Sequence, residues 1–310
     1  MIVSVSRRTD VPAFYSDWFY KRIEEGYVYT VNPFNPKQIS KISLSRDVVD
    51  CFVFWTKNPL AMMGKLDLLE DYMYYFQFTI TGYGKDIEPN LPSKREVLLP
   101  TFMELSRKIG KDRMVLRYDP ILLTQNYTKE YHIKAFEEIT RTLKGYTTRV
   151  VISFVDLYAK IKSNMKAVKM LPLEEETIGE IAKAFAVIAK ENDMSIESCS
   201  EVYNLTRYGI KAGACVDQVL IEQLTGLRLD VTKDLNQRKE CGCVQSIDIG
   251  VYNTCLHGCK YCYANYSNTS VANAVKEYEK TSPLLCRKIS EDVVVKEKHM
   301  KSLFDRQLHF

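Results

Sequence analysis

The chain has 310 residues, of which 46% are hydrophobic, so it can bury a full core in one large domain. Its formal net charge of +4 is far below the positive charge typical of a dedicated nucleic-acid-binding domain. No stretch of about 18 consecutive apolar residues is present, so we expect no membrane-spanning segment. The first residues show no secretory-signal pattern, which predicts a cytoplasmic protein whose nine cysteines stay reduced.

Strand and helix patterns alternate along the first two thirds of the chain. Runs of β-branched and aromatic residues predict strands over residues 2–5, 27–31, 51–55, 75–80, 114–118, 150–154 and 194–199. Helical spacing of apolar residues predicts helices over residues 16–25, 100–109, 129–143 and 173–191. An eighth strand is expected over residues 246–251. This alternation is typical of a parallel sheet with helical crossovers, and we expect an α/β fold, either a (β/α)8 or a partial TIM-like barrel.

Polar side chains follow several of the predicted strands. Lys57 and Asn58 come directly after one strand, and Arg117 and Asp119 lie at the end of another. The strand C-termini of a parallel barrel open on one face, which carries the chemistry in enzymes of this fold. These charges could pair locally with their neighbours, but their repetition at strand ends favours a binding site.

The cysteines are concentrated in the last third of the chain. Cys51 lies near the start, whereas the other eight cysteines all follow residue 198. We therefore expect residues 1–200 to form the TIM-like β/α barrel body. Residues 201–310 are expected to form a Cys-rich segment that completes the barrel and lies over its mouth.

Three of these cysteines share a short loop after the eighth predicted strand. Cys255, Cys259 and Cys262 are spaced Cys-x3-Cys-x2-Cys. Three thiolates on one loop can hold three corners of a 4Fe–4S cluster and leave the fourth iron open to a ligand. The alternative is a zinc site with His257 as fourth ligand, although His257 is separated from Cys255 and from Cys259 by only one residue each, which is cramped.

This loop, with Tyr261 before its last cysteine, resembles the signature loop of the radical S-adenosylmethionine (SAM) superfamily. The resemblance implies that Cys255, Cys259 and Cys262 bind a 4Fe–4S cluster, that its open iron chelates SAM, and that Tyr261 lies beside the adenine. Most members of that superfamily carry the loop after their first strand, but loops after the first and last strands of a barrel open side by side. Nearly the whole chain also resembles a domain-of-unknown-function family often labelled DNA-repair-photolyase-like.

Four further cysteines predict a second centre. Cys199 closes a predicted strand, Cys215 follows a turn, and Cys241 and Cys243 precede the signature loop. Four thiolates complete the ligand set of an auxiliary 4Fe–4S cluster or of a structural zinc, and we favour iron–sulfur. Alternatively, Cys199 and Cys215 are buried core residues. Cys51 and Cys286 are expected to be structural.

Charged residues at the predicted mouth are candidates for binding SAM. Lys57 and Arg117 suit its carboxylate, whereas Asp119 and Glu201 suit its ammonium group and ribose hydroxyls. Asn58 is a further candidate contact.

The resemblance implies a radical SAM enzyme, an oxidoreductase or lyase that generates a 5′-deoxyadenosyl radical. A low-potential electron donor of the ferredoxin or flavodoxin type would serve it, and its substrate would be a small molecule, a peptide or a nucleic acid. Cleavage of a different SAM bond, giving an aminocarboxypropyl radical, is a further alternative. The rival hypothesis is an iron–sulfur or zinc protein without SAM chemistry.

Overall fold

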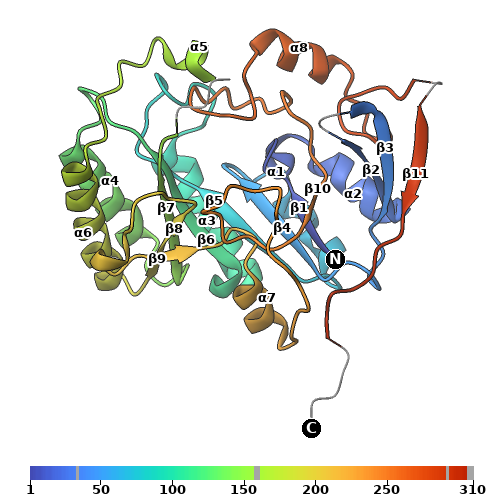
Figure 1. The fold of residues 1–310 in the computed structure, drawn as a ribbon, viewed down its shortest axis with the longest axis horizontal. Helices are drawn as coiled ribbons and strands as arrows, with labels where there is room; N and C mark the ends of the chain where they lie inside the picture. Colours follow the sequence, from blue (N-terminus) through green and yellow to red (C-terminus); the bar gives the residue numbers. More distant parts are fainter. Residues whose placement is uncertain (33–34, 157–160, 291–292, 306–310) are drawn as a thin grey trace.

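The computed structural model describes residues 1–32, 35–156, 161–290 and 293–305. Eight strands form one sheet in the order β10-β1-β4-β5-β6-β7-β8-β9, and all neighbours are parallel (Figure 1). The strands are β1 (Ile2–Val5), β4 (Cys51–Thr56), β5 (Tyr74–Thr79), β6 (Met114–Ile121), β7 (Arg149–Phe154), β8 (Ser195–Cys199), β9 (Lys211–Gly213) and β10 (Ile247–Asp248). The predicted α/β class with a parallel sheet is confirmed. The sheet is nevertheless open, with β9 and β10 as its edge strands. The expected closure into a (β/α)8 barrel is therefore wrong.

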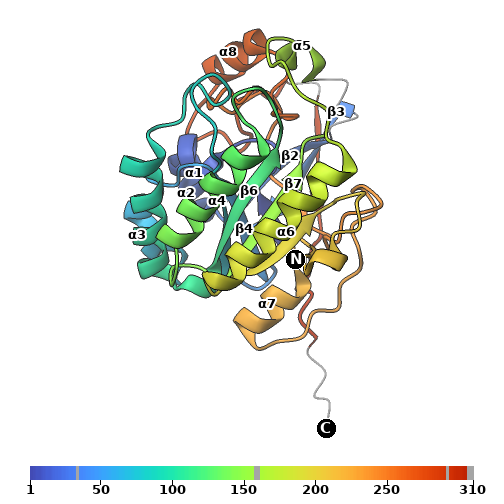
Figure 2. The same ribbon diagram turned by 90° about the vertical axis from the view of Figure 1, so that its left-hand side faces the viewer.

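Helices α3, α4 and α6 cover one face of this sheet, while α7 lies on the opposite side (Figure 2). The helices of the described chain are α1 (Val11–Phe14), α2 (Ser16–Glu25), α3 (Leu99–Ile109), α4 (Lys129–Thr142), α5 (Lys162–Met165), α6 (Glu175–Glu191), α7 (Gln218–Thr225) and α8 (Asn268–Lys276). The boundaries follow local chemistry: the Thr128 hydroxyl caps the start of α4, and Gly26 ends α2 in the left-handed region. None of the described helices has the length and apolar character needed to cross a membrane.

A separate three-stranded sheet lies at the side of the molecule. It consists of β2 (Tyr27–Asn32), β3 (Asn35–Ser43) and β11 (Val294–Lys298), with β3 in the centre. Strands β2 and β3 are antiparallel, whereas β11 runs parallel to β3. The strand predicted over residues 27–31 therefore exists, but it belongs to this small sheet and not to the main one.

Side chains on the two faces of the main sheet enter two different apolar cores. Along β4, Phe52 and Phe54 face the helices, whereas Cys51 and Val53 face the other side. The core on that other side includes buried residues of segment 215–244. This segment, which contains α7, thus covers the face that a closed barrel would turn inward.

Candidate functional site

Strand β10 places the first cysteine loop at the carboxyl edge of the main sheet. Val3 of β1 pairs with Ile247, and Ser4 pairs with Asp248. The Asp248 carboxylate accepts hydrogen bonds from the Ser4 hydroxyl at 2.8 Å and from the Arg7 backbone N–H at 2.8 Å. The loop after the last strand therefore lies beside the loop after the first.

The structure brings Cys255, Cys259 and Cys262 together. The pKa of the Cys255 thiol is raised by burial and further raised by the two other sulfur atoms. Burial also raises the pKa of Cys259 to about 12, although the nearby Lys57 opposes the shift. The turn is held by the Cys262 N–H, which donates to the Cys259 carbonyl at 3.1 Å, and by the Asn265 side chain, which donates to the Cys255 carbonyl at 2.5 Å. Cys255 and Cys259 are buried and Cys262 is partly exposed, and the two hydrogen bonds fix the backbone that carries them.

A buried carboxylate, Glu88, organises the side of this loop that carries Tyr261. Glu88 is 1% exposed and accepts hydrogen bonds from the Tyr261 hydroxyl and, at 2.9 Å, from the Thr81 hydroxyl. The Nζ atoms of Lys57 and Lys94 lie 2.8 Å and 2.7 Å from its two carboxylate oxygens. Burial opposes ionisation of Glu88, but the two ammonium groups outweigh it and lower its pKa to about 2.

His257 has a partner other than the three thiols. Its Nε2 lies 2.7 Å from Oδ2 of Asp10, and both side chains are 5% exposed. The same Asp10 oxygen accepts the Lys57 backbone N–H at 2.7 Å. The zinc alternative, which needs His257 as a ligand, would therefore have to use Nδ1 or break this contact.

The four remaining candidate ligands also meet. The Sγ atoms of Cys199 and Cys215 are 3.2 Å apart, and Cys243 contacts both Cys215 and Cys241. The hydrogen bond from Cys243 lowers the pKa of Cys241 to about 7. Cys215, Cys241 and Cys243 belong to the core on the face turned away from α3, α4 and α6. Four cysteines from three separate stretches of sequence thus lie close together on this side of the sheet.

The donor chemistry of both cysteine sets suits metals that prefer sulfur. In the described ranges, however, no group of three or more His, Cys, Asp or Glu side chains is arranged so that it could hold a metal ion. A tetrahedral zinc with bonds of about 2.3 Å would hold sulfur atoms about 3.8 Å apart, and a cubane holds them farther apart. The Cys199 and Cys215 sulfur atoms would need to separate by a rotamer change to admit either group.

Of the five buried side-chain polar atoms without a hydrogen-bond partner in the described chain, four lie in segments that follow β1, β8 and β10, and the fifth is Nε of Arg22 on α2. Within the described chain they include Nδ1 of His257, Oδ1 of Asn265, Oγ1 of Thr9 and Oγ of Ser200. His257 and Asn265 belong to or flank the first cysteine loop, and Ser200 follows Cys199 directly. Buried polar atoms of this kind are rare and indicate a bound group or water.

Arg117 and Asp119 lie closer to the second cysteine set than to the first loop. The Arg117 guanidinium contacts the Asp119 carboxylate and donates to the Cys215 sulfur at 2.9 Å and to Gln77 at 3.1 Å. The Glu201 carboxylate accepts the Phe154 N–H at 2.7 Å, and burial raises its pKa to about 7. Arg117 and Asp119 thus lie beside Cys199 and Cys215, and the expected contacts of all three residues with SAM stay a prediction.

Arg7 lies between the two sets. Its guanidinium interacts electrostatically with Asp248 and with the sulfur atoms of Cys243 and Cys215. Its backbone carbonyl accepts a hydrogen bond from the Tyr263 hydroxyl at 3.0 Å. Tyr263 follows Cys262 in the first loop. One strand end therefore contacts both cysteine-bearing segments.

Among the expected SAM contacts, Lys57 and Tyr261 are brought together, with Nζ 5.5 Å from the ring centre. Asn58 lies at the same strand end, where its N–H donates to the Thr56 hydroxyl at 3.0 Å. Sequence reasoning missed Glu88 and Lys94. Glu88 lies in the loop after β5 and Lys94 begins the short helix Lys94–Leu98 that follows it, so both are outside the strand-end positions, and no spacing pattern distinguishes them.

Fold and site together define an open-sheet α/β protein with two cysteine sets, one at the carboxyl edge of its parallel sheet and one on the face away from α3, α4 and α6. The chain belongs to the family described as Domain of unknown function (DUF1848), whose model matches residues 2–264. That range contains every strand of the main sheet and all seven cysteines of the two sets. No curated protein and no solved structure matches the chain.

Proposed function

We propose that this protein is a radical SAM enzyme whose 4Fe–4S cluster is held by Cys255, Cys259 and Cys262. The observation that carries the proposal is the meeting of these three thiols on one loop at the carboxyl edge of a parallel sheet. Three protein ligands leave one iron for SAM, as the resemblance of the loop implies. When bound, the reduced cluster supplies the electron that cleaves SAM into methionine and a 5′-deoxyadenosyl radical.

The residues around the loop suit the binding of SAM. Two ammonium groups, on Lys57 and Lys94, face the single carboxylate of Glu88, so this group keeps a net positive charge. A net positive charge attracts the carboxylate of SAM. The Tyr261 ring is oriented by its hydrogen bond to Glu88 and offers a flat apolar surface for the adenine.

The second cysteine set is proposed to hold an auxiliary 4Fe–4S cluster, with zinc as the alternative. All four ligands come from the protein, so this centre is closed to substrate and suits electron transfer or structural support. The Arg117 hydrogen bond to Cys215 stabilises a thiolate there. The substrate class is open to a small molecule, a peptide or a nucleic acid, and the enzyme would act as an oxidoreductase or lyase in the cytoplasm.

The proposal is tested by anaerobic reconstitution with iron and sulfide, followed by dithionite and SAM. We expect 5′-deoxyadenosine and methionine, and their loss in the Cys255→Ala, Cys259→Ala and Cys262→Ala variants. Cys51→Ala is the matched control and is expected to keep the activity. Methylthioadenosine in place of 5′-deoxyadenosine would indicate the aminocarboxypropyl alternative.

One observation favours the rival function, a metal or redox protein without SAM chemistry: the second set is complete without any ligand from outside. A protein of this kind would bind metal but would not respond to SAM. Reconstituted protein that forms no SAM product, and whose cluster EPR signal does not change on adding SAM, would refute the enzyme proposal.

A further inference from the structure

Two cysteines of the second set lie closer together than two ligands of one metal ion. The Sγ atoms of Cys199 and Cys215 are 3.2 Å apart, although the residues lie 16 positions apart in the chain. Sulfur ligands of a tetrahedral zinc are about 3.8 Å apart, whereas the sulfur atoms of a disulfide are about 2.05 Å apart. The two sulfur atoms of this pair are therefore in direct contact, with no space for an ion between them.

The main sheet fixes the backbone that carries each of these two sulfur atoms. Cys199 ends β8, and its Cα atom pairs with that of Gly213 at the end of β9, two positions before Cys215. The Cys215 carbonyl accepts hydrogen bonds from the Tyr75 hydroxyl at 2.5 Å and from the Gln77 side chain at 3.0 Å. The folded chain thus keeps the two thiols next to each other.

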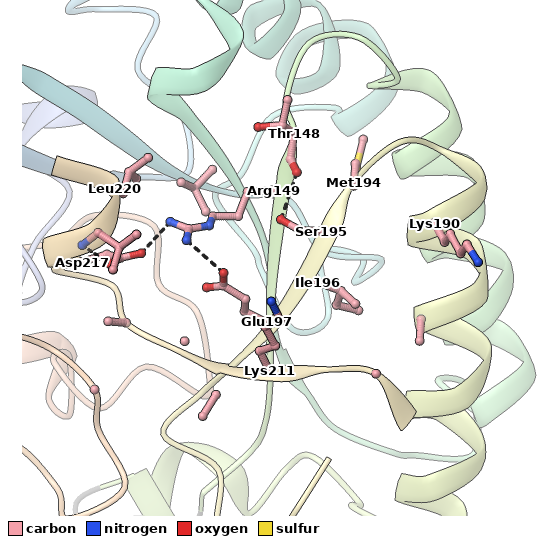
Figure 3. A pocket seen from close by; sticks show the side chains of 18 of the residues that line it. Thr148, Arg149, Lys190, Met194, Ser195, Ile196, Glu197, Lys211, Asp217 and Leu220 are labelled. Atoms are coloured by element: carbon pink, nitrogen blue, oxygen red, sulfur yellow. Dashed lines mark hydrogen bonds and ion pairs between the residues drawn. The ribbon is translucent and has the colours of Figure 1, made fainter. Parts of the chain in front are cut away.

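An arginine also bridges the two segments that carry this pair. The Arg149 guanidinium lies 2.9 Å from Glu197 and 2.7 Å from Asp217 (Figure 3). Glu197 lies two positions before Cys199, and Asp217 lies two positions after Cys215. The three charged side chains line a groove of about 1480 Å³ on the side of the molecule. Their two ion pairs hold the end of β8 against the turn that follows β9.

The two thiols differ in their access to solvent. Cys199 is partly exposed, whereas Cys215 is buried. The Arg117 guanidinium donates a hydrogen bond to the Cys215 sulfur at 2.9 Å and so holds it in place beside Cys199. An accessible thiol next to a second, resolving thiol is the arrangement found at cysteines that undergo reversible oxidation.

We propose that Cys199 and Cys215 of the metal-free chain form a reversible disulfide by exchange with a small-molecule disulfide. Cys199 gives up its proton and attacks one sulfur atom of this reagent, which forms a mixed disulfide and releases half of the reagent as a thiol. The Cys215 sulfur gives up its proton and attacks the Cys199 sulfur, which forms the intramolecular bond and releases the other half. The two cysteines together lose two electrons and two protons, and these reduce the reagent to two thiols.

This inference does not rest on the proposed function, because the exchange needs neither a metal nor SAM. It gives the second set a role in the chain before any metal is bound. In the cytoplasm such a bond is expected to be transient, since the thiol pool of that compartment reduces it. The bond uses two of the four thiols proposed to hold the auxiliary centre, so that centre could assemble only after reduction.

The test is peptide mapping of the full-length, metal-free protein after reaction with oxidised glutathione. Metal is removed with a chelator and dithiothreitol, and the reductant is then washed out under argon. After alkylation of free thiols, trypsin leaves Cys199 on residues 191–207 and Cys215 on residues 212–228, while Cys241 and Cys243 share residues 240–260. We expect the link between the first two peptides to exceed every other link about tenfold, because only this pair is in direct contact at 3.2 Å. Dithiothreitol should remove the link.

Two variants and one control condition identify the roles of the two thiols. Cys215→Ser should stop at the mixed disulfide, with one glutathione retained on Cys199. Cys243→Ser, which replaces another buried cysteine of the same set, is the matched control and should still form the link. In urea the wild-type chain should lose its preference for this pair, because the fold no longer holds the two thiols together.

Three results would overturn the inference: no link in the folded wild-type protein, glutathione that stays on Cys199 there, or a link from Cys215 to Cys243 in place of Cys199. Each of them leaves the proposed function untouched, since the mapping involves no SAM. Conversely, a reconstituted protein that forms no 5′-deoxyadenosine would refute the enzyme function without affecting the disulfide.

Discussion

Glu88 is the residue on which the surroundings of the first cysteine loop depend. Its carboxylate receives Lys57, Lys94, Thr81 and Tyr261, which come from three different stretches of the chain. A buried charge is tolerated only when partners compensate for its lost hydration, and here two cations and two hydroxyls do so. The Glu88 side chain thus fixes both the Tyr261 ring and the ammonium groups of Lys57 and Lys94, which are proposed to attract SAM.

Replacing this carboxylate is expected to be costly. Glu88→Gln removes the negative charge and leaves the two partly buried ammonium groups of Lys57 and Lys94 without their shared carboxylate. We expect a loss of about 3 kcal/mol in the free energy of unfolding, as for other broken buried pairs. Urea denaturation of the metal-free protein measures it, and the exposed Glu104→Gln is the control, with an expected change below about 0.5 kcal/mol. Equal stabilities of the two variants would contradict the role assigned to Glu88.

The same residue predicts a pH dependence. Because its pKa is lowered from 4.5 to about 2 in the folded protein, its stabilisation is complete above pH 4.5 and is lost as the pH falls toward 2. The stability difference between wild type and Glu88→Gln should therefore shrink across this range. Urea midpoints of both proteins between pH 6 and pH 2.5 test it, and a constant difference would rule out Glu88 as the titrating group.

At this scale the sequence predicts cysteines better than it predicts their surroundings. The spacing of Cys255, Cys259 and Cys262 is visible on one short stretch, so their grouping is evident without a structure. Glu88 and Asp10 reach the loop only through the fold, from segments more than 160 residues away. Periodicity and spacing carry no information about contacts of this kind.

Among the structural elements, the two turns that carry the second cysteine set depend on close backbone packing. The Cys241-Gly242-Cys243 turn lies against Gly213 at the end of β9, where a side chain at position 242 would meet a carbonyl oxygen at 2.9 Å. The glycine between the cysteines therefore permits their approach to Cys215. Close backbone packing therefore explains why the single residue between Cys241 and Cys243 is a glycine, which the sequence alone does not.

Gly242→Ala is accordingly expected to disturb the second centre alone. The added methyl group must push the turn away from Gly213, which separates Cys241 and Cys243 from Cys215. We expect about four iron atoms per chain after reconstitution instead of about eight, with the first cluster retained. Iron analysis and EPR measure this, and Gly64→Ala, whose new methyl group would meet no atom within 4 Å, is the control. Full iron content in the Gly242→Ala variant would show that the turn tolerates a side chain.

Strand patterns locate most strands correctly but do not assign them to sheets. The strands predicted over residues 2–5, 51–55 and 150–154 lie in the main sheet, whereas the equally clear pattern over residues 27–31 lies in the small one. Strand β3 has its two buried isoleucines three positions apart, so it lacks the alternation of period two that reveals a strand. Strand β9 has only three residues, too few for any periodic signal.

For the whole molecule, the main correction concerns closure of the sheet. Strand β9 and strand β10 remain edges, and segment 215–244 packs on the face that a closed barrel would fill with side chains. The number of strands read from a sequence does not determine whether a sheet closes, because closure depends on strand tilt and stagger. Segment 215–244, which carries three of the cysteines, is therefore part of the core.

This position predicts that metal at the second set stabilises the entire fold. Ligands that bind only the folded state add to its stability, and the four thiols are assembled only when segment 215–244 is in place. We expect reconstitution to raise Tm by about 5–10 °C. The Cys241→Ser/Cys243→Ser variant should lose most of this gain, whereas Cys51→Ala should keep it. A similar gain in both variants, measured by anaerobic calorimetry, would assign the stabilisation to the first loop.

The pairing of β1 with β10 has a consequence for the order of events during synthesis. Val3 leaves the ribosome before its partner Ile247, which is made some 240 residues later. Until then β1 has one bare edge, and Ser4 and Arg7 lack the Asp248 carboxylate that holds them. Contacts so distant in sequence form slowly. The backbone that would hold the proposed first cluster is thus complete only after β10 has been synthesised, and we expect iron insertion to follow that point.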